Sequence, residues 1–595
     1  MKFLYFLIML IALLAGVRAY SAGSVPTVFF SDLTDGPVSG WEGSATKGAA
    51  VSIWGRNFGS SRGSSCVIVG SVNLTEDSDY VEWGSTTNPV TPIGLERITF
   101  FLNSDMQPGS TLISVTTPEG SSSQIPFYCR ALGANHIYFV KTTGDDDKDG
   151  LSVENAWASF GKARSAAVAG DTVYFKGGTW TAYDDGSTWA NAILYLRTNN
   201  GVSNHNNGTQ NNSIAFASYP GEVAQMCNGL NADNGNATHG VYRHGSLTKD
   251  SLQFWTFSKF KGYCWHYCFR WSNIDLTYDD NLRIIGWDAT TTIPRTDINT
   301  PESIGGQIML QNGDWDNIYL YGNYMHHAGK TNESDPFGYK VQSIYISGFQ
   351  GQYNNINLAW NEFYSNNGNV QIYGHNSMDS IETIYIHDNL FRENGTTGMV
   401  LNGGDGLTTY SFVKNAWVYN NIFMQNLSYA MKITDSSTGS RGGKFYVYNN
   451  VFYDNGDAEI YSPNPEALYI YNNIFHTNNM VYFTHSPGTD ANHYGLNNCF
   501  YGSASIPSWS ADSIYSNPGF IAEAPCKYSD FAIQPDSPGV DGGTSSVSSV
   551  VATDFMGLTR PQGMACDIGA FEYALQSLPP ADITSPAAPL NLRFK

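Results

Sequence analysis

The sequence predicts an all-β protein in which a β-sandwich is followed by a long parallel β-helix. Three observations carry this prediction. A strand-and-turn motif repeats six times between residues 318 and 475, short alternating strands fill residues 25–130, and a short amphipathic helical pattern lies between these regions. Alternating strands place successive side chains on opposite faces, and neither region shows a sustained helical period.

The repeat is marked by an Asn that follows an apolar strand and precedes an apolar pair. It recurs at intervals of 38, 28, 32, 29 and 23 residues. Such periods indicate stacked units that cannot bury their apolar faces alone, and units made of strands and turns predict a β-solenoid. The marking residues are Asn323, Asn361, Asn389, Asn421, Asn450 and Asn473.

The alternation within each repeat predicts which side chains face inward. The repeated Asn is expected at a corner with left-handed backbone geometry, where its amide can form a ladder along the stack. The predicted inward pairs are Ile318/Leu320, Ile356/Leu358, Ile384/Ile386, Ala416/Val418, Phe445/Val447 and Leu468/Ile470.

The chain start has the pattern of a secretory signal. Lys2 precedes an apolar run from Phe3 to Ala15, and Val17–Ala19 forms a small-residue cleavage site, so residues 1–19 are expected to be removed. No later apolar run is long enough to span a bilayer. The mature protein is therefore expected to be soluble, secreted and monomeric.

Cysteine content fits an exported chain. Eight Cys are present, and disulfide bonds are expected in an oxidising compartment. Cys66 could pair with Cys129 in the first domain, and Cys499 with Cys526 near the end. The remaining pairings are open.

Charge limits the partners. The 52 acidic and 31 basic residues give a net charge of −21, which argues against nucleic acid as a ligand. A local cationic cleft for an anionic extracellular polysaccharide is compatible with this balance.

Residues 25–130 resemble the TIG-type immunoglobulin-like domain. The resemblance lies in VSIWGRNFG followed by a short strand, and in the later LISVTTPEG. It implies a sandwich that serves as a spacer, an interaction surface or a carbohydrate-binding appendage, without catalysis of its own.

Residues 136–573 resemble secreted right-handed parallel β-helix proteins of the pectate-lyase-like type. The resemblance lies in the opening HIYFVKTTGDDDKDG, in a capping helix expected over residues 156–169 before a first strand at Thr172–Lys176, and in the closing CDIGAFEY. Residues 574–595 form a Pro-rich tail. Between residues 181 and 317 the register of the rungs stays open.

The opening loop is a candidate cation site. Asp145, Asp147, Asp149 and Gly150 fit D-x-D-x-D-G, a tight loop of carboxylates of the kind that binds Ca²⁺. Position twelve is Ala156, so the loop is not an EF-hand. A structural Ca²⁺ and a solvated Asp turn are the two interpretations.

An outward aromatic file is the candidate sugar-binding surface. Stacked strands would align rings at about 4.8 Å, close to the length of one pyranose. The alternative is that the rings stack on one another or lie under a loop. The first file is Tyr319, Tyr385, Trp417, Tyr446 and Tyr469, interrupted by Asn357, and the second is Tyr321, Ala359, His387, Tyr419, Tyr448 and Tyr471.

The strands after the bends carry the candidate catalytic residues. Alignment places Tyr345, Gln371, Val400, Lys432 and Glu459 in one outward file, and Ser347, Tyr373, Asn402, Thr434 and Tyr461 in the next. His375, Asp405 and Asp435 end three of these strands, where they could act as acid or base.

Lys432 lies between Met431 and Ile433 after an Asn-rich bend, which resembles the catalytic lysine segment of family 9 polysaccharide lyases. The resemblance implies that Lys432 takes the C5 proton of a uronic acid while Ca²⁺ neutralises the carboxylate. The preceding rung departs from the family, since Val400 and Asn402 stand where carboxylates are expected. Glu459 as a neighbour would make Lys432 one half of an ion pair.

Other chemistry stays open. Asp405 and Asp435 would suit a glycoside hydrolase. In the loop 326–340, the adjacent His326 and His327 are expected to point to different sides. The non-enzymatic alternative is an adhesion protein that holds glycan on Trp417 and its neighbours. Tyr373 is a further catalytic candidate, and Gln371 and Asn402 complete the predicted substrate face.

Overall fold

The structure is a computed structural model. It describes residues 25–574, except residues 88, 132–135, 183–190, 200–201, 231–236, 246–250, 274–277, 292–304, 312, 330–340, 349–350, 369, 375–379, 405–412, 434–442, 464, 479–480, 485–489 and 503. The predicted signal segment and nearly all of the Pro-rich tail fall outside these residues. Within them, no helix is long and apolar enough to cross a bilayer.

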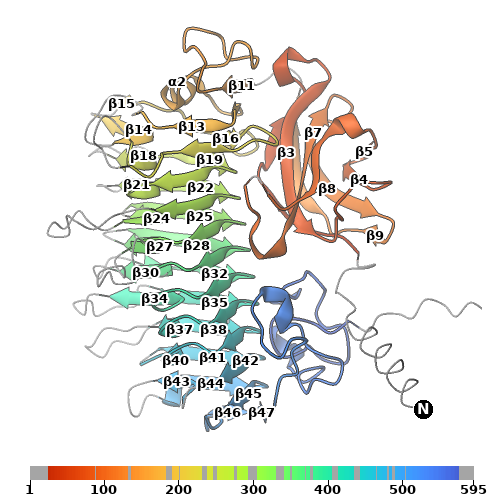
Figure 1. Cartoon of the computed structure of the whole chain (residues 1–595), viewed down its shortest axis with the longest axis vertical. Helices are drawn as coiled ribbons and strands as arrows, with labels where there is room; N and C mark the ends of the chain where they lie inside the picture. Colours follow the sequence, from red (N-terminus) through yellow and green to blue (C-terminus); the bar gives the residue numbers. More distant parts are fainter. Residues whose placement is uncertain are drawn as a thin grey trace, which may run out of the picture.

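The first domain is the predicted sandwich (Figure 1). Its two sheets have the orders β1-β3-β7-β6 and β2-β10-β8-β4-β5, with β9 on β8. Between them Val51, Ile53, Phe100 and Ile113 are fully buried. The elements are β1 (Thr27–Ser31), β2 (Asp35–Pro37), η1 (Trp41–Gly43), β3 (Lys47–Arg56), β4 (Cys66–Val69), β5 (Val72–Leu74), η2 (Asp77–Asp79), β6 (Tyr80–Ser85), η3 (Pro92–Gly94), β7 (Glu96–Asn103), β8 (Gly109–Thr117), β9 (Gly120–Ser121) and β10 (Ile125–Arg130).

The second domain is a right-handed parallel β-helix whose rungs contribute strands to three sheets, here called sheets I, II and III. Sheet I contains β11 (Ile137–Val140), β12 (Thr172–Phe175), β16 (Ile214–Ser218), β19 (Gln253–Ser258), β22 (Tyr278–Ile285), β25 (Asp314–Tyr321), β28 (Gln352–Ala359), β31 (Ser380–Ile381), β32 (Ile384–His387), β35 (Asn415–Tyr419), β38 (Lys444–Tyr448), β41 (Ala467–Tyr471), β44 (His493–Leu496) and β46 (Ser510–Ala511).

Sheet II follows sheet I in each rung. Its strands are β13 (Gly178–Trp180), β17 (Ala224–Met226), β20 (Lys261–Cys264), β23 (Asp288–Thr291), β26 (Tyr324–His326), β29 (Glu362–Tyr364), β33 (Leu390–Arg392), β36 (Ile422–Met424), β39 (Val451–Tyr453), β42 (Ile474–Thr477), β45 (Cys499–Gly502) and β47 (Ile514–Tyr515).

Sheet III closes the rung. Its strands are β15 (Val202–Ser203), β14 (Ala192–Asn199), β18 (His239–Gly245), β21 (Tyr267–Asn273), β24 (Gly305–Gln311), β27 (Val341–Gly348), β30 (Val370–Gly374), β34 (Met399–Gly404), β37 (Tyr429–Ile433), β40 (Ala458–Tyr461) and β43 (Phe483–Thr484). Short helical turns η6 (Asp490–Asn492), η7 (Tyr528–Phe531) and η8 (Ser545–Val547) follow in the closing part of the chain.

The predicted asparagine ladder is confirmed. Each Oδ1 from Asn361 to Asn498 accepts both the backbone N–H and the amide of the ladder Asn in the preceding rung, at 2.8–3.2 Å. The ladder residues are fully buried. The expected left-handed geometry belongs instead to the residue before each Asn, such as Trp360 and Asp388, with φ of 56° and 55°. This turn swings the Asn amide inward.

A second ladder lies one bend further on, and the sequence prediction missed it. Asn366, Asn394, Asn426 and Asn455 are linked by amide-to-Oδ1 hydrogen bonds of 2.8–3.2 Å. Between the two ladders, a column of phenylalanine rings on sheet II stacks inside the helix with centroids 4.6–5.2 Å apart. The column consists of Phe363, Phe391, Phe423, Phe452, Phe475 and Phe500.

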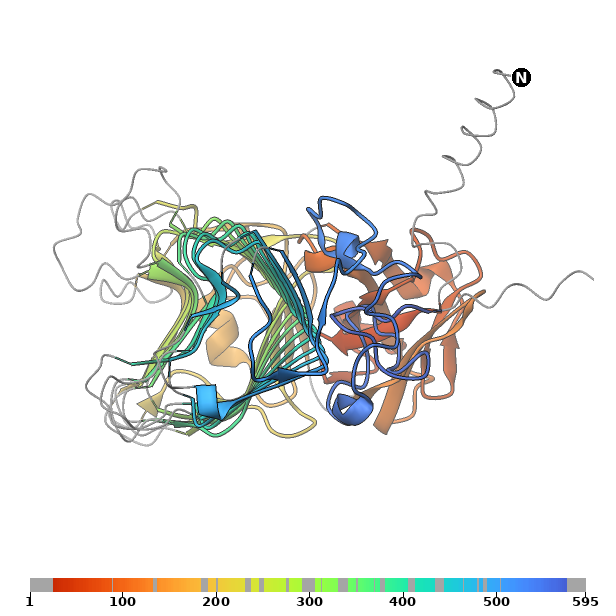
Figure 2. The same ribbon diagram turned by 90° about the horizontal axis from the view of Figure 1, so that it is seen from below.

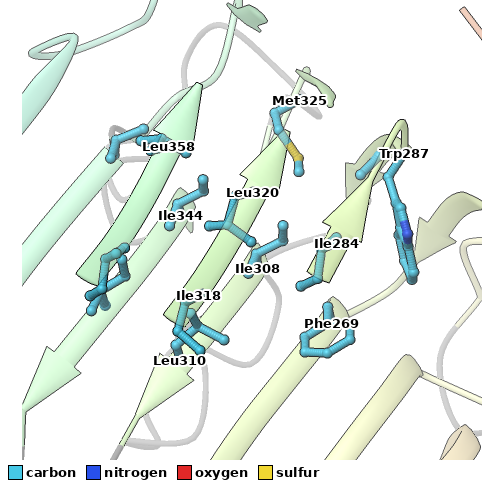
Figure 3. Packing of buried hydrophobic residues seen from close by; sticks show 14 of the residues in the cluster. Phe269, Ile284, Trp287, Ile308, Leu310, Ile318, Leu320, Met325, Ile344 and Leu358 are labelled. Carbon is cyan, nitrogen blue, oxygen red and sulfur yellow. The ribbon is translucent and has the colours of Figure 1, made fainter. Parts of the chain in front are cut away.

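The predicted inward side chains form the core. All twelve residues of the six predicted pairs are fully buried. Figure 3 shows how the aliphatic side chains of successive rungs, such as Ile318, Leu320 and Leu358, meet across the interior.

Helix α2 (Phe160–Ala166) caps the first rungs and is shorter than the predicted 156–169. The Ser159 side chain caps its N-terminus by accepting from the Lys162 N–H, and Asp146 in turn accepts from the Ser159 hydroxyl. Inside the cap, the Phe160 ring stacks on Phe175 at 4.0 Å.

The sandwich is docked on the outer face of sheet I rather than tethered as a separate spacer (Figures 1 and 2). The buried Lys259 Nζ lies 2.9 Å from Asp32 Oδ2 of the sandwich. The Tyr174 hydroxyl bonds both backbone groups of Ala50, at 2.8 and 2.9 Å. Because such polar groups are buried only when paired, these contacts fix the orientation of the two domains.

The closing segment, residues 515–574, covers the later rungs on the same side of the helix. Its Arg560 donates to Asn420 Oδ1 at 3.2 Å, and its Val547 and Val551 pack on Tyr448. The sandwich and this segment thus share one flank, opposite sheet III (Figure 2).

The disulfide of the described residues is Cys227–Cys264, and the two predicted pairings are wrong. Cys66 and Cys129 lie on β4 and β10, which are separated by β8. Two strand spacings, about 9.5 Å, exceed the reach of a disulfide. Cys499 is buried within sheet II, whereas Cys526 is exposed in the closing segment.

Removal of one ladder residue tests the role of the ladder. In Asn421→Ala the buried backbone N–H of Asn389 loses its acceptor, at about 1–3 kcal/mol, and the Asn389 amide keeps only its bonds to the Leu358 and His387 carbonyl groups. We expect a clearly lower unfolding midpoint in denaturant. Asn478→Ala, at an exposed Asn, should change stability by less than about 0.5 kcal/mol. Equal midpoints for the two variants would contradict the role of the ladder.

Candidate functional site

The predicted aromatic files on sheet I have the predicted register. Tyr319, Asn357, Tyr385, Trp417, Tyr446 and Tyr469 lie opposite one another on successive strands, and the file continues to Tyr494. The second file, from Tyr321 to Tyr471, is equally in register.

The later rings of the first file stack face to face. Trp417 stacks on Tyr446 at 3.9 Å and 9°, and Tyr446 on Tyr469 at 5.1 Å and 6°. Sugars pack against open ring faces, whereas these faces stack on neighbouring rings, and the same rings pack against the cluster of Val547 and Val551. The second file is covered: Tyr321 contacts Phe30 of the sandwich, and Tyr448 lies under Val547. A role of these rings in glycan binding stays a prediction.

Sheet III, whose strand β37 contains Lys432, lies on the flank opposite the sandwich and the closing segment (Figures 1 and 2). Met431 and Ile433 are buried inside the helix, so Lys432 points outward as predicted. Gln371, Val400 and Lys432 are consecutive in one file, again as predicted.

The predicted neighbour Glu459 is wrong. Lys432 lies opposite Tyr461, with its Nζ 5.0 Å from the ring centroid. Glu459 is fully buried, and Asn455, the last residue of the second ladder, donates to its Oε2 at 2.6 Å. The ladder thus draws the carboxyl group inward. Among the described residues no carboxylate pairs with Lys432.

The polar surroundings of Lys432 are amides and phenols. Gln342 Nε2 donates to Gln371 Oε1 at 3.1 Å, two rungs before Lys432, and Tyr429 packs on Tyr461 at 5.5 Å. Tyr373 pairs with Gly403, not with the predicted Asn402, because a bulge interrupts β34. His375, Asp405, Asp435 and the Asn402 side chain lie outside the described residues, so their roles stay predictions.

The opposite end of the same file holds a cluster that the sequence prediction missed, because the register of residues 181–317 was open. The Arg270 guanidinium lies over the rings of Tyr242 and Tyr267, at 4.9 and 5.4 Å. His239 stacks between the same two rings and lies 3.1 Å from His266. The sequence signals that could have found it are two aromatic and basic segments, GVYRH at 240–244 and HYCFR at 266–270.

The acidic loop bonds its own backbone. Asp145 Oδ1 accepts from the Asp147 N–H and Asp149 Oδ1 from the Leu151 N–H, each at 3.0 Å. The described residues contain no group of three His, Cys, Asp or Glu side chains placed to hold a metal ion. The Ca²⁺ site at Asp145, Asp147 and Asp149 stays a prediction.

His326 and His327 do not point apart. Their Nδ1 atoms lie 2.8 Å from each other, and His326 Nε2 lies 2.8 Å from Asp288 Oδ1. The backbone of His327 has a φ of 54°, and this left-handed turn reverses the expected alternation.

Comparisons with known proteins give likenesses of fold. No protein-family model matches the chain, and no curated protein sequence matches it. Similar solved structures include pectate lyase Pel9A, at 15% identity over 73% of this chain and 96% of that chain with a TM-score of 0.46. A complex of XylC with xylose follows at 11% identity, 74% and 99% coverage and a TM-score of 0.36.

A rhamnogalacturonan lyase is also similar, at 12% identity, 64% and 85% coverage and a TM-score of 0.29. At these identities and TM-scores, the likenesses do not assign an activity to this chain.

Glu459 gives a prediction for pH dependence. Burial raises its pKa to about 8, against the opposing hydrogen bond from Asn455. Between about pH 4.5 and 8 the folded state therefore holds a proton that the unfolded state releases, and stability falls as pH rises. Glu459→Gln should be more stable than wild type at pH 8, by a few kcal/mol, and similar to it near pH 4.

Denaturant unfolding at both pH values measures this difference. Glu466→Gln, at an exposed carboxylate that pairs with Lys444, serves as the control. A wild-type protein as stable at pH 8 as the Glu459→Gln protein would refute a neutral, buried Glu459.

Proposed function

We propose that this protein binds an acidic polysaccharide on the outer face of sheet III and cleaves it by β-elimination at a uronic acid, with Lys432 as the base. A soluble, secreted, monomeric protein fits this role, and the signal pattern of residues 1–19 supports export.

The position of Lys432 is the observation that carries the proposal. Its amine is half-buried on the flank opposite the sandwich, lies over the Tyr461 ring, and has no carboxylate partner among the described residues. Most basic side chains of the protein interior are paired, as Arg97 is with Glu82. In a chain with 21 more acidic than basic residues, a lysine without a carboxylate partner among the described residues suits an anionic ligand.

β-Elimination requires two kinds of group on this face. A base takes the C5 proton, and a positive group stabilises the charge that develops on the uronate carboxylate before the bond to the O4 leaving group breaks. A lysine acts as a base only where no carboxylate holds its proton, and the inward turn of Glu459 removes the one carboxylate predicted there.

The Ca²⁺ that the lyase resemblance implies does not fit the described neighbours of Lys432. These are Val400 and Tyr461, which offer a hard cation no carboxylate oxygen. Asp405 and Asp435, predicted nearby, lie outside the described residues. The proposed step is therefore limited to proton transfer from C5 to Lys432.

Two outcomes compete with the lyase. A glycoside hydrolase would use Asp405 and Asp435 and produce reducing ends without an unsaturated sugar. A glycan-binding protein would retain the polymer without product, and binding through the sheet I rings would then weaken in Trp417→Ala. Neither outcome depends on Lys432 as a base.

A polysaccharide screen with Lys432 variants tests the proposal. Uronic-acid and neutral polysaccharides are incubated with wild type, Lys432→Ala and Lys432→Arg, and both ultraviolet absorbance and reducing ends are followed. We expect absorbance only with uronic-acid polymers, and a loss of at least about 100-fold in Lys432→Ala with binding retained. The control is Lys444→Ala, which removes an equal charge from sheet I. Full activity of Lys432→Ala would refute the role of Lys432.

A further inference from the structure

We propose that Arg270, held between Tyr242 and Tyr267, is the centre of a second subsite that binds a carboxylate of the same polysaccharide, five rungs from Lys432. This inference rests on the proposed function in that it shares the ligand and the face. It adds a site that was not predicted from the sequence, and it sets a minimum length for the ligand.

The register places both cations in one line. The file runs from Arg270 through Met309, Tyr345, Gln371 and Val400 to Lys432, one residue on each successive strand of sheet III. With about 4.8 Å for each rung, the two positive groups lie roughly 24 Å apart. An extended chain of about five sugars covers this distance.

The guanidinium of Arg270 is fixed by aromatic rings. Tyr242 lies opposite it on β18, and Tyr267 lies three residues earlier on β21, with the ring centroids 4.9 and 5.4 Å away. His239 stacks between the same rings, at 5.2 Å from Tyr242 and 5.8 Å from Tyr267. Stacking on rings orients a guanidinium and leaves its N–H edge available for a planar anion.

That edge lacks a partner. Arg270 Nε is buried and makes no hydrogen bond, and the described residues place no carboxylate in an ion pair with Arg270. A buried donor without an acceptor is costly, and Nε together with one terminal nitrogen forms the fork that binds a carboxylate through two parallel hydrogen bonds. The Nε atoms of Arg130 and Arg560 are also buried without a hydrogen bond, but each of these arginines pairs through Nη1 with a carboxylate, Arg130 with Asp35 and Arg560 with Glu572, which Arg270 does not within the described part of the chain.

The titratable groups next to Arg270 sense its positive charge. Burial lowers the pKa of His244, and the charges of Arg270 and Arg243 lower it further. Burial raises the pKa of Tyr267, while the charge of Arg270 opposes this rise. Among the described residues, an anion at Arg270 would therefore meet a cation and neutral groups rather than a competing carboxylate.

Binding to a uronic-acid polysaccharide tests the subsite. All proteins carry Lys432→Ala, so that the polymer stays intact, and affinity is measured with and without Arg270→Gln, Arg270→Lys or Lys444→Ala. We expect Arg270→Gln to weaken binding by about tenfold or more, Arg270→Lys by less, and Lys444→Ala to have no effect. Equal affinity with and without Arg270→Gln, in a variant with wild-type thermal unfolding, would overturn the subsite.

Two further arms identify the contact. When the carboxylates of the polymer are reduced to alcohols, the proteins with and without Arg270→Gln should bind it with equal affinity. A remaining difference in affinity would overturn carboxylate recognition. A preference for a sulfated neutral polymer would overturn it as well. Oligomers of two or three sugars, which are too short to reach from position 432 to Arg270, should bind the Arg270→Gln protein and its parent equally around position 432, whereas oligomers of about six sugars should bind the parent more tightly.

The results separate the two proposals. Binding that depends on Arg270 in a protein that forms no unsaturated product would keep the subsite and refute the lyase. Cleavage that depends on Lys432 but is indifferent to Arg270 at every ligand length would keep the lyase and refute the subsite. Absence of binding to any uronic-acid polymer would refute both.

Discussion

The hydrogen bond from one asparagine amide to the asparagine of the next rung is the constraint on which the structure depends. Each ladder Oδ1 accepts two N–H groups from the preceding rung, in surroundings that water does not reach. A slip of one residue would bury a polar strand face and break both bonds. The ladder therefore fixes the register, and every file of side chains on the outside follows from it.

The two flanks of the β-helix then differ by what covers them. On sheet I the sandwich and the closing segment bury part of the aromatic surface, and the remaining rings stack on one another. On sheet III the outward file keeps cations without carboxylate partners at Arg270 and Lys432 among the described residues. The flank opposite the sandwich is thus the one whose described residues suit a polyanion.

Periodicity explains which features could be predicted. Where the Asn motif recurs, alternation was enough to place the inward pairs and the register of sheet I, because every rung repeats the same choice. Before Asn323 the motif is absent, so Arg270 and its tyrosines were missed. Glu459 was misplaced because its carboxyl group bonds Asn455 at the end of a ladder, which overrides strand alternation.

Other errors came from contacts between distant segments and from local backbone geometry. Phe30 packs on Tyr321 from almost 300 residues away, and Val547 packs on Tyr448 from about 100 residues away. Nothing in the local sequence pattern of either tyrosine indicates these contacts. The left-handed residue at His327 reversed the direction of one side chain without any change in the apolar pattern. Such features depend on the folded chain as a whole.

The continuous bracing along one flank has a mechanical consequence. The sandwich is anchored from Tyr174 to Glu362, and the closing segment from Leu390 to Cys499, so nearly every rung is fastened from outside. A solenoid held in this way resists bending and stretching. The spacing between the rungs of sheet III is then constant. A flexible polymer must adopt this spacing, because the protein cannot adjust to the polymer.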